Sequence, residues 1–226
     1  MTSRKLPPVP DPVQINVLII EDHSMVAAAL AGALDAEDDI AVVDIVTHPS
    51  GVRDALAVDG VRVDVILLDL RLGEGADALA LIPEIRAAAP AAKIVVLSAW
   101  SDDRSIARAI EAGCDGYLLK EQQVDELVAG IRTVVANEAV FAPSIMKRVF
   151  GLLQPSKATT STLSTRELEV LQRLGDGEST IDIAAAMFLS TNTVRNHVQS
   201  IMQKLGVHSR LEAVAHGVRA GLITVT

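Results

Sequence analysis

The sequence has few aromatic residues and only one cysteine. Phe, Trp and Tyr together make up 2% of the chain, so its core must be built from aliphatic side chains. The single Cys114 excludes an internal disulfide, and the sequence has neither a secretory signal nor an apolar run of about 18 residues that could cross a membrane. We therefore expect a reduced, soluble, cytoplasmic protein. Its 226 residues are enough for one domain of ordinary size and a smaller one.

The negative charge of the chain is unevenly distributed. The formal net charge is -9, of which residues 1–155 contribute -10 (13 Lys and Arg, 23 Asp and Glu) and residues 156–226 contribute +1 (7 and 6). The acidic part is a poor candidate for nucleic-acid binding, whereas the near-neutral part is compatible with it. Charge alone is a weak argument, because a dedicated DNA-binding module often has a larger basic excess.

Strand-like and helix-like segments alternate between Ile15 and about Asn137. Apolar runs predict strands at residues 15–20, 40–46, 63–68, 93–97 and 115–119, and helical spacing predicts helices at 24–35, 49–58, 76–88, 102–112 and 124–136. Five such β-α units predict an α/β domain at residues 15–137, with a five-stranded parallel sheet and helices on both faces. Right-handed crossovers favour the flavodoxin-like strand order 2-1-3-4-5.

The rest of the chain divides into three segments. Residues 1–14 contain four prolines and no periodicity, which predicts a disordered arm. Residues 138–162 predict a helix followed by a flexible linker. Residues 163–226 predict a small all-α domain with helices at about 165–174, 180–187, 191–205 and 210–220. Three of these helices start with the serine of a capping-box pattern, at Ser164, Ser179 and Ser209.

Reactive side chains follow four of the five predicted strands. They are Glu21 and Asp22 after the first, Asp69 after the third, Ser98 after the fourth and Lys120 after the fifth. Because the carboxyl ends of parallel strands meet at one edge, where open α/β sheets bind ligands, these side chains should lie together. A lone aspartate at a strand end is more often a turn former, so the prediction depends on the whole set.

The three carboxylates predict a metal site. They would repel one another unless a cation neutralised them. Mg²⁺ prefers oxygen ligands and usually takes one or two protein carboxylates, so we expect Asp22 and Asp69 to bind it while Glu21 holds one of its waters. Lys120 and Ser98 add a positive charge and a hydroxyl. The set therefore predicts a cradle for a phosphoryl group, with Asp69 as the nucleophile.

The predicted helix at 191–205 has two different faces. Its apolar residues recur at helical spacing and should face a core: Val194, Val198, Ile201 and Leu205. Arg195, Asn196 and Gln199 lie away from that stripe and can reach base edges or phosphates from the major groove, although a polar face is usually only solvated. The expected contacts to the DNA backbone come from Ser190, Thr191, Lys204 and Arg210.

Motifs in both parts resemble a known family. The strings VDVILLDLRL, VVLSAW and AGCDGYLLK resemble the receiver domain of bacterial two-component response regulators. LSTRELEVL, IAAAMFLSTNTVRNHV and IMQKLGVHSRLEAV resemble the LuxR-type helix-turn-helix of the NarL/FixJ subfamily. The resemblance covers about residues 15–137 and 163–222. It implies a transcriptional switch rather than an enzyme: a sensor histidine kinase phosphorylates the receiver, and a homodimer binds double-stranded DNA when active.

The resemblance also implies a role for each site residue of the receiver. It makes Asp69 the phosphoacceptor, Glu21 and Asp22 the acidic pair that binds Mg²⁺, and Lys120 the lysine that all these receivers share. Each of these positions agrees with the role that strand-end chemistry predicts.

Three further roles come from the resemblance alone. Ser98 and Tyr117 become the switch residues, and the backbone carbonyl of Arg71 becomes a further metal contact. The chain departs from the family after Asp69, where a Met-Pro pair is usual and this sequence reads LGEGAD at 72–77. Two glycines in place of a restricted proline predict a more mobile loop.

Two other functions remain open. An aspartate-nucleophile phosphatase also uses carboxylates and Mg²⁺ at strand ends, but it normally has a second acid where this chain has Arg71. A phosphorylation-independent DNA-binding regulator with a degenerate receiver is favoured by the altered loop. Mg²⁺-dependent labelling with a small phosphodonor separates the three, because turnover indicates a phosphatase, a stable adduct a receiver, and no adduct a degenerate receiver.

Overall fold

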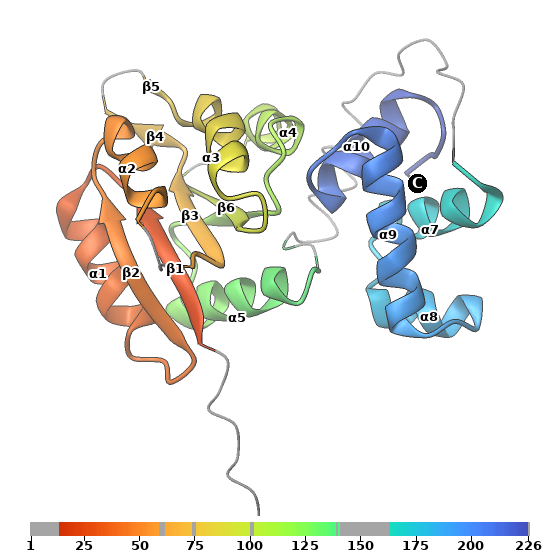
Figure 1. Ribbon diagram of the computed structural model, residues 1–226, viewed down its shortest axis with the longest axis horizontal. Helices are drawn as coiled ribbons and strands as arrows, with labels where there is room; N and C mark the ends of the chain where they lie inside the picture. Colours follow the sequence, from red (N-terminus) through yellow and green to blue (C-terminus); the bar gives the residue numbers. More distant parts are fainter. Residues whose placement is uncertain are drawn as a thin grey trace, which may run out of the picture.

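The computed structural model of the chain describes residues 14–58, 62–73, 76–99, 102–138, 140 and 163–225. An α/β part and a smaller all-α part lie side by side (Figure 1). The predicted fold class is confirmed in both parts. The expected N-terminal arm and linker lie outside the described residues, except for Gln14, Glu138 and Val140.

The α/β part is built on one parallel sheet of five strands. They are β1 (Ile15–Ile20), β2 (Ile40–Val46), β3 (Val65–Asp69), β6 (Lys93–Ser98) and β7 (Gly116–Leu119). Their order in space is β2-β1-β3-β6-β7, which is the predicted order 2-1-3-4-5. All residues of the central strand β3 are buried, which explains why its sequence is an unbroken apolar run up to the terminal aspartate.

Helices pack on both faces of this sheet. They are α1 (Ser24–Leu34), α2 (Val52–Leu56), α3 (Ile82–Ala88), α4 (Asp103–Glu111) and α5 (Val124–Val135). Successive strand residues point to opposite faces, so they contribute to two separate cores. Val17 and Ile19 pack with α1 and α5, whereas Leu18 and Ile20 belong to the core that contains α2, α3 and α4.

Two stretches differ from the predicted helices. The helix predicted at 76–88 begins only at Ile82, because Ala76–Asp77 form strand β5 and Ala78–Leu81 form a 3₁₀ turn. Strand β5 pairs antiparallel with β4 (Arg71–Leu72) in a sheet of two strands. The helix predicted at 49–58 likewise begins with a 3₁₀ turn, Pro49–Gly51. A 3₁₀ turn joined to a short helix has nearly the same apolar spacing as one longer helix, so periodicity does not separate them.

The all-α part has four helices among its described residues. They are α7 (Thr165–Gly175), α8 (Thr180–Met187), α9 (Thr191–Leu205) and α10 (Arg210–Arg219). Complete capping boxes are present at Ser164 and Ser179, as predicted. The third is only half formed: the Ser209 side chain accepts from the backbone N–H of Glu212, but the Glu212 carboxylate accepts from the N–H of His208 instead.

Glu167 joins two helices of the all-α part. Its carboxylate accepts hydrogen bonds from the backbone N–H of Ser164, the hydroxyl of Ser200 and the ammonium of Lys204, so it both caps α7 and ties α7 to α9. Burial alone would raise the pKa of Glu167, but these donors lower the pKa to about 2. The ionised carboxylate therefore stabilises the folded state.

We expect Glu167→Gln to destabilise the all-α part in a pH-dependent manner. The stabilisation from ionised Glu167 is on the order of 2 kcal/mol. It is fully present above the ordinary glutamate pKa of 4.5 and is lost as the pH falls toward the folded-state pKa of about 2. Calorimetry should show a lower Tm for the variant at pH 7 and a smaller deficit at about pH 3. The control is Glu169→Gln on the exposed side of the same helix; equal effects of the two changes would contradict this role.

Candidate functional site

The carboxyl edge of the sheet brings together the predicted charged side chains. Glu21 follows β1, Asp69 ends β3 and Lys120 follows β7. The Lys120 ammonium lies 2.9 Å from Asp69 Oδ2 and also forms an ion pair with Glu21 Oε2. Strand β6 lies between β7 and β3. The long side chain of Lys120 therefore passes the end of β6 to reach Asp69 at the end of β3, and it extends further to reach Glu21 after β1.

Burial controls the charges at this edge. Glu21 is 1% exposed and Asp69 3%. Burial raises the pKa of Asp69; Lys120 opposes this shift, and repulsion from Glu21 adds to it. Burial alone would lower the pKa of Lys120, but the two carboxylates outweigh it and the pKa is raised. Lys120 therefore remains protonated and supplies the positive charge that the buried acids need.

Asp22 is positioned by the loop that departs from the family pattern. The backbone N–H of Gly73 donates to Asp22 Oδ2 at 2.8 Å, and this bond is the main reason that the pKa of Asp22 is lowered. Gly73 has a φ of +65°, a conformation that glycine adopts at little cost. The sequence predicted only a mobile loop here, whereas the described part forms the β4–β5 pair and orients a site carboxylate.

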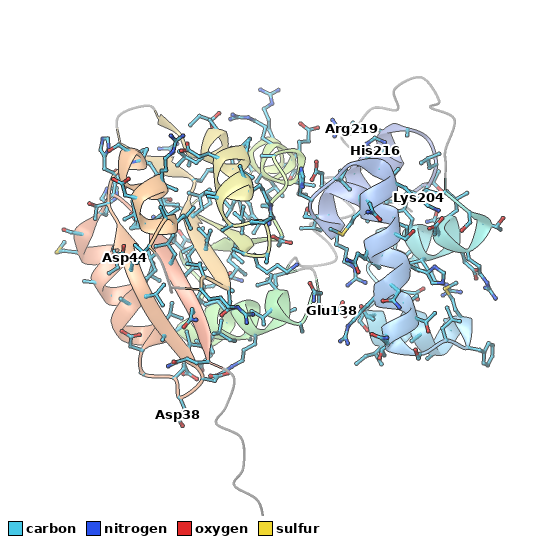
Figure 2. All side chains as sticks on the ribbon, in the orientation of Figure 1. Asp38, Asp44, Glu138, Lys204, His216 and Arg219 are labelled. Carbon is cyan, nitrogen blue, oxygen red and sulfur yellow. The ribbon has the colours of Figure 1, made fainter. Side chains whose placement is uncertain are left out.

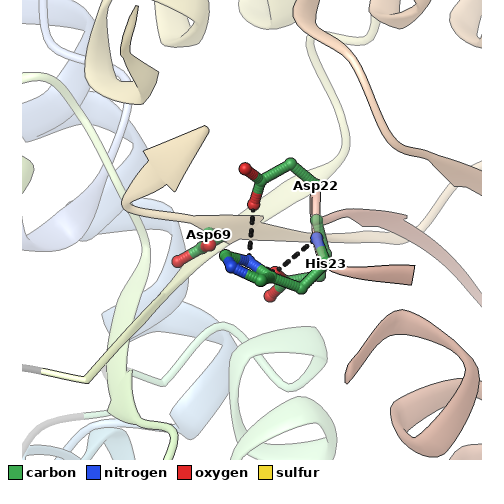
Figure 3. A group of neighbouring side chains, drawn as sticks. Asp22, His23 and Asp69 are labelled. Carbon is green, nitrogen blue, oxygen red and sulfur yellow. Dashed lines mark hydrogen bonds and ion pairs between the residues drawn. The ribbon is translucent and has the colours of Figure 1, made fainter. Parts of the chain in front are cut away.

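His23 also belongs to the cluster, although no histidine was predicted there. Its Nδ1 lies 2.8 Å from Asp22 Oδ1 and 3.1 Å from Glu21 Oε1, and Figure 3 shows the ring with its ion pair to Asp22 as a dashed line. The hydrogen bond with Glu21, together with the charge of Asp22, raises the pKa of His23. Its position directly after the acidic pair was the available signal, but a lone histidine is usually solvated.

The acidic cluster offers oxygen atoms that a hard cation could use. Glu21, Asp22, His23 and Asp69 can each bring one ligand atom within 4.8 Å of the others. Asp22 Oδ1 and Asp69 Oδ2 are buried and lie near basic groups, yet they make no hydrogen bond of normal geometry among the described residues. The backbone of Arg71 hydrogen-bonds the Asp69 carboxylate, so it too lies at the site. Carboxylate oxygens of this kind suit Mg²⁺.

Ser98 and Tyr117 are buried beside the charged cluster. Ser98 ends β6 and Tyr117 lies on the neighbouring strand β7. Burial raises the pKa of Tyr117, and a hydrogen bond with Ser98 acts in the opposite direction. The structure therefore brings the two predicted switch residues into contact with each other, Ser98 on the strand next to that of Asp69 and Tyr117 one strand further.

The second candidate site lies on α9. Val194 and Ile201 are buried, whereas Arg195, Asn196 and Gln199 are exposed, as the helical spacing predicts. At the start of the helix, the Ser190 side chain accepts from the backbone N–H of Thr193, and Thr191 is the first helical residue. The hydroxyl of Ser190 thus fixes the end of the helix that would enter a DNA groove first.

Lys204 and Arg210 already have protein partners in this structure. The Lys204 ammonium lies 2.7 Å and 2.8 Å from the two Glu167 oxygens. Arg210 is 9% exposed and pairs with Glu138, which follows α5 in the α/β part. Contacts of these two residues with the DNA backbone remain a prediction, and each requires that an existing partner be exchanged for a phosphate.

Comparisons with known protein families match both parts of the chain. The family of response regulator receiver domains matches residues 17–132, and the luxR family of bacterial regulatory proteins matches residues 161–216. Response regulator protein VraR from Staphylococcus epidermidis and its counterpart from Staphylococcus aureus are each 30% identical to this chain over 210 residues. The match covers 92% of this chain and 99% of each relative.

Solved structures share the fold. The RcsB response regulator of Salmonella typhimurium has a TM-score of 0.54 at 20% identity, covering 89% of this chain and 97% of that chain. A LuxR-family response regulator from Aurantimonas has a TM-score of 0.54 at 22% identity, covering 60% of this chain and 95% of that chain.

Among the described residues, no helix is both long enough and apolar enough to cross a membrane.

Proposed function

Because the chain belongs to the two-component response regulators that combine a receiver with a LuxR-type DNA-binding domain, we propose that phosphorylation of Asp69 controls its binding to DNA. Regulators of this family act with sensor histidine kinases and bind DNA. The receiver would comprise residues 15–137 and the DNA-binding domain residues 163–226. The chain acts as a switch and turns over no small-molecule substrate.

The contact of Lys120 with both Glu21 and Asp69 carries this proposal. An Asp69 oxygen attacks the phosphorus of a kinase phosphohistidine, the P–N bond breaks, and the phosphoryl group arrives beside a fixed ammonium. Asp22 and Asp69 would hold Mg²⁺ together with the Arg71 carbonyl, and Glu21 would hold one of its waters. The ion supplies charge that neutralises the phosphoryl oxygens.

Ser98 and Tyr117 provide the link to the rest of the receiver. The Ser98 hydroxyl is hydrogen-bonded to Tyr117 in this structure. A phosphoryl oxygen on Asp69 competes for that hydroxyl, and Tyr117 then loses a hydrogen-bond partner. Tyr117 packs in the same core as Ile106 and Ala109 of α4, so a change in its position is transmitted to that helix.

The DNA-binding role rests on the exposed polar face of α9. Arg195, Asn196 and Gln199 present donors and acceptors suited to base edges, on a helix whose other face is buried. The active form is a homodimer, in which two copies of α9 would read two half-sites.

A degenerate receiver remains the second candidate, and the altered loop favours it. The Gly73 contact with Asp22 argues the other way, because the loop supports a metal acid instead of disrupting the site. The phosphatase alternative has less support, since Arg71 stands where a second acid is expected and the family consists of DNA-binding regulators.

Asp69→Asn should abolish phosphorylation by a small phosphodonor in the presence of Mg²⁺, because the near-isosteric amide is not a nucleophile. Intact-mass spectrometry should show a stable adduct on the wild type and on Asp54→Asn, a control that removes an exposed acid elsewhere. An adduct on the Asp69 variant would place the phosphoacceptor at another residue. An unlabelled wild type would instead favour the degenerate receiver.

Asp22→Asn should weaken Mg²⁺ binding by about tenfold or more. The signal is the fluorescence of Trp100, the only tryptophan, two positions after Ser98 in the sequence. Glu121→Gln removes the same charge from an exposed residue next to Lys120 and should leave the affinity nearly unchanged. If both changes weaken binding equally, Asp22 acts through general charge and is not a ligand.

Single alanine substitutions of Arg195, Asn196 and Gln199 should reduce discrimination between target and random DNA, by roughly 1 to 3 kcal/mol for each side chain that makes a good base contact. Fluorescence anisotropy of the phosphorylated protein on both duplexes measures the ratio. Lys204→Ala should instead weaken both duplexes alike and lower the salt dependence. Equal reductions in affinity on both duplexes for all three helix-face variants would argue against base reading.

A further inference from the structure

The carboxylate of Glu138, the first residue after the receiver, contacts donors of the DNA-binding domain. Glu138 follows α5, and Figure 2 shows it on the side that faces the all-α part. Its carboxylate accepts hydrogen bonds from the backbone N–H of Thr180, with distances of 3.2 Å and 3.3 Å to the two oxygens, and from Arg210 Nη1. Thr180 is the first residue of α8 and Arg210 the first of α10, so two helix starts converge on one acid.

These donors form a pocket suited to a larger anion than one carboxylate. The Thr180 N–H belongs to the first turn of α8, where backbone donors are unpaired and the helix is partially positive. Arg210 is 9% exposed, and its Nη2 has no hydrogen-bond partner among the described residues. The Thr180 hydroxyl lies 3.3 Å from Arg210 Nη1 and completes the polar lining. The Arg210 guanidinium therefore has a donor that could serve one more acceptor oxygen.

The pocket opens toward the face that is proposed to read DNA. Thr180, Arg210 and Glu138 line a cleft between the two domains, and the same cleft is lined by Arg195, Asn196 and Gln199. Its volume of about 510 Å³ is that of a small-molecule site, so a duplex does not fit while the domains are closed. The pocket and the reading side chains therefore become available to DNA together.

We propose that the Thr180 N–H and hydroxyl and the Arg210 guanidinium bind a phosphate of the DNA backbone, and that Glu138 occupies this site in the closed arrangement as an intramolecular competitor. The inference rests on the proposed DNA-binding function and adds a phosphate site and the group that blocks it. Carboxylate and phosphate oxygens accept from the same donors, so occupation by one excludes the other.

The first experiment compares three variants of the full-length, unphosphorylated protein, each of which removes one carboxylate. Glu138→Gln should bind random duplex DNA about tenfold more tightly than the wild type at low salt. Glu126→Gln, exposed at the opposite end of α5, controls for net charge. Glu111→Gln breaks a second ion pair between the domains, Arg219–Glu111 at 3.0 Å, and controls for loosening of the domain contact.

An increase in DNA affinity that is specific to Glu138→Gln supports competition at the pocket. An increase of the same size in either control variant overturns it, because the change in net charge or the opening of the domains would then explain the higher affinity. If the wild type and Glu138→Gln bind equally well, the competitor role is wrong while the DNA-binding function stands. If neither protein binds any duplex, phosphorylated or not, the DNA-binding function itself fails, and this inference fails with it.

The second experiment identifies the ligand as a phosphate. In the Glu138→Gln background, Arg210→Gln should reduce the slope of log affinity against log salt concentration by about 0.9, the value for one phosphate that is no longer neutralised. Arg210→Lys keeps the charge and should keep the slope. Circular dichroism establishes that the variants are folded, and the Glu138 series decides the inference if Arg210→Gln is not. An unchanged slope in a folded Arg210→Gln protein overturns the phosphate site.

Discussion

The receiver site depends on one cation, the ammonium of Lys120 between the carboxylates of Glu21 and Asp69. Two buried acids at one sheet edge repel each other and have lost their hydration, so one of them would bind a proton if no positive charge were near. Lys120 follows the edge strand β7, and in the observed strand order its long side chain reaches the ends of β1 and β3. The topology of the sheet is thus a condition of the chemistry, because it places a cation against the Asp69 carboxylate and so opposes the rise in its pKa.

The same edge of the sheet also determines how a change at Asp69 can reach the rest of the receiver. Ser98 ends the strand between Asp69 and Tyr117, so its hydroxyl can serve either neighbour but not both in full. Asp22, in contrast, is held from outside the sheet by the backbone of Gly73. The Asp22 carboxylate is therefore fixed by a loop, whereas the Ser98 hydroxyl can bond either of two partners. A phosphoryl group on Asp69 can change the partner of that hydroxyl.

The sequence predicted those features that depend on local pattern. Buried strands appear in the sequence as apolar runs. Ser164 and Ser179 each begin a helix through a capping box with the acidic residue three positions later. The buried and exposed faces of α9 follow from the helical spacing of its apolar residues. The β4–β5 pair was not predicted, because it depends on the left-handed conformation of Gly73 and on a contact with Asp22, 51 positions earlier. The sequence predicted a DNA-backbone contact for Arg210 but not its protein partner, for the same reason: Glu138 lies 72 positions away.

The geometry of the Glu138 contact suits a reversible competitor of DNA at the proposed phosphate site. The carboxylate meets the Thr180 N–H at 3.2 Å and 3.3 Å, which is long for a charge-assisted hydrogen bond, and it leaves Arg210 Nη2 unused. A phosphate group has more acceptor oxygens and can engage both guanidinium nitrogens at once. DNA therefore gains a contact that the receiver does not make, while the receiver has the advantage of being tethered in the same chain. A change in the receiver that weakens the tethered contact then favours DNA, because the two ligands compete for one site.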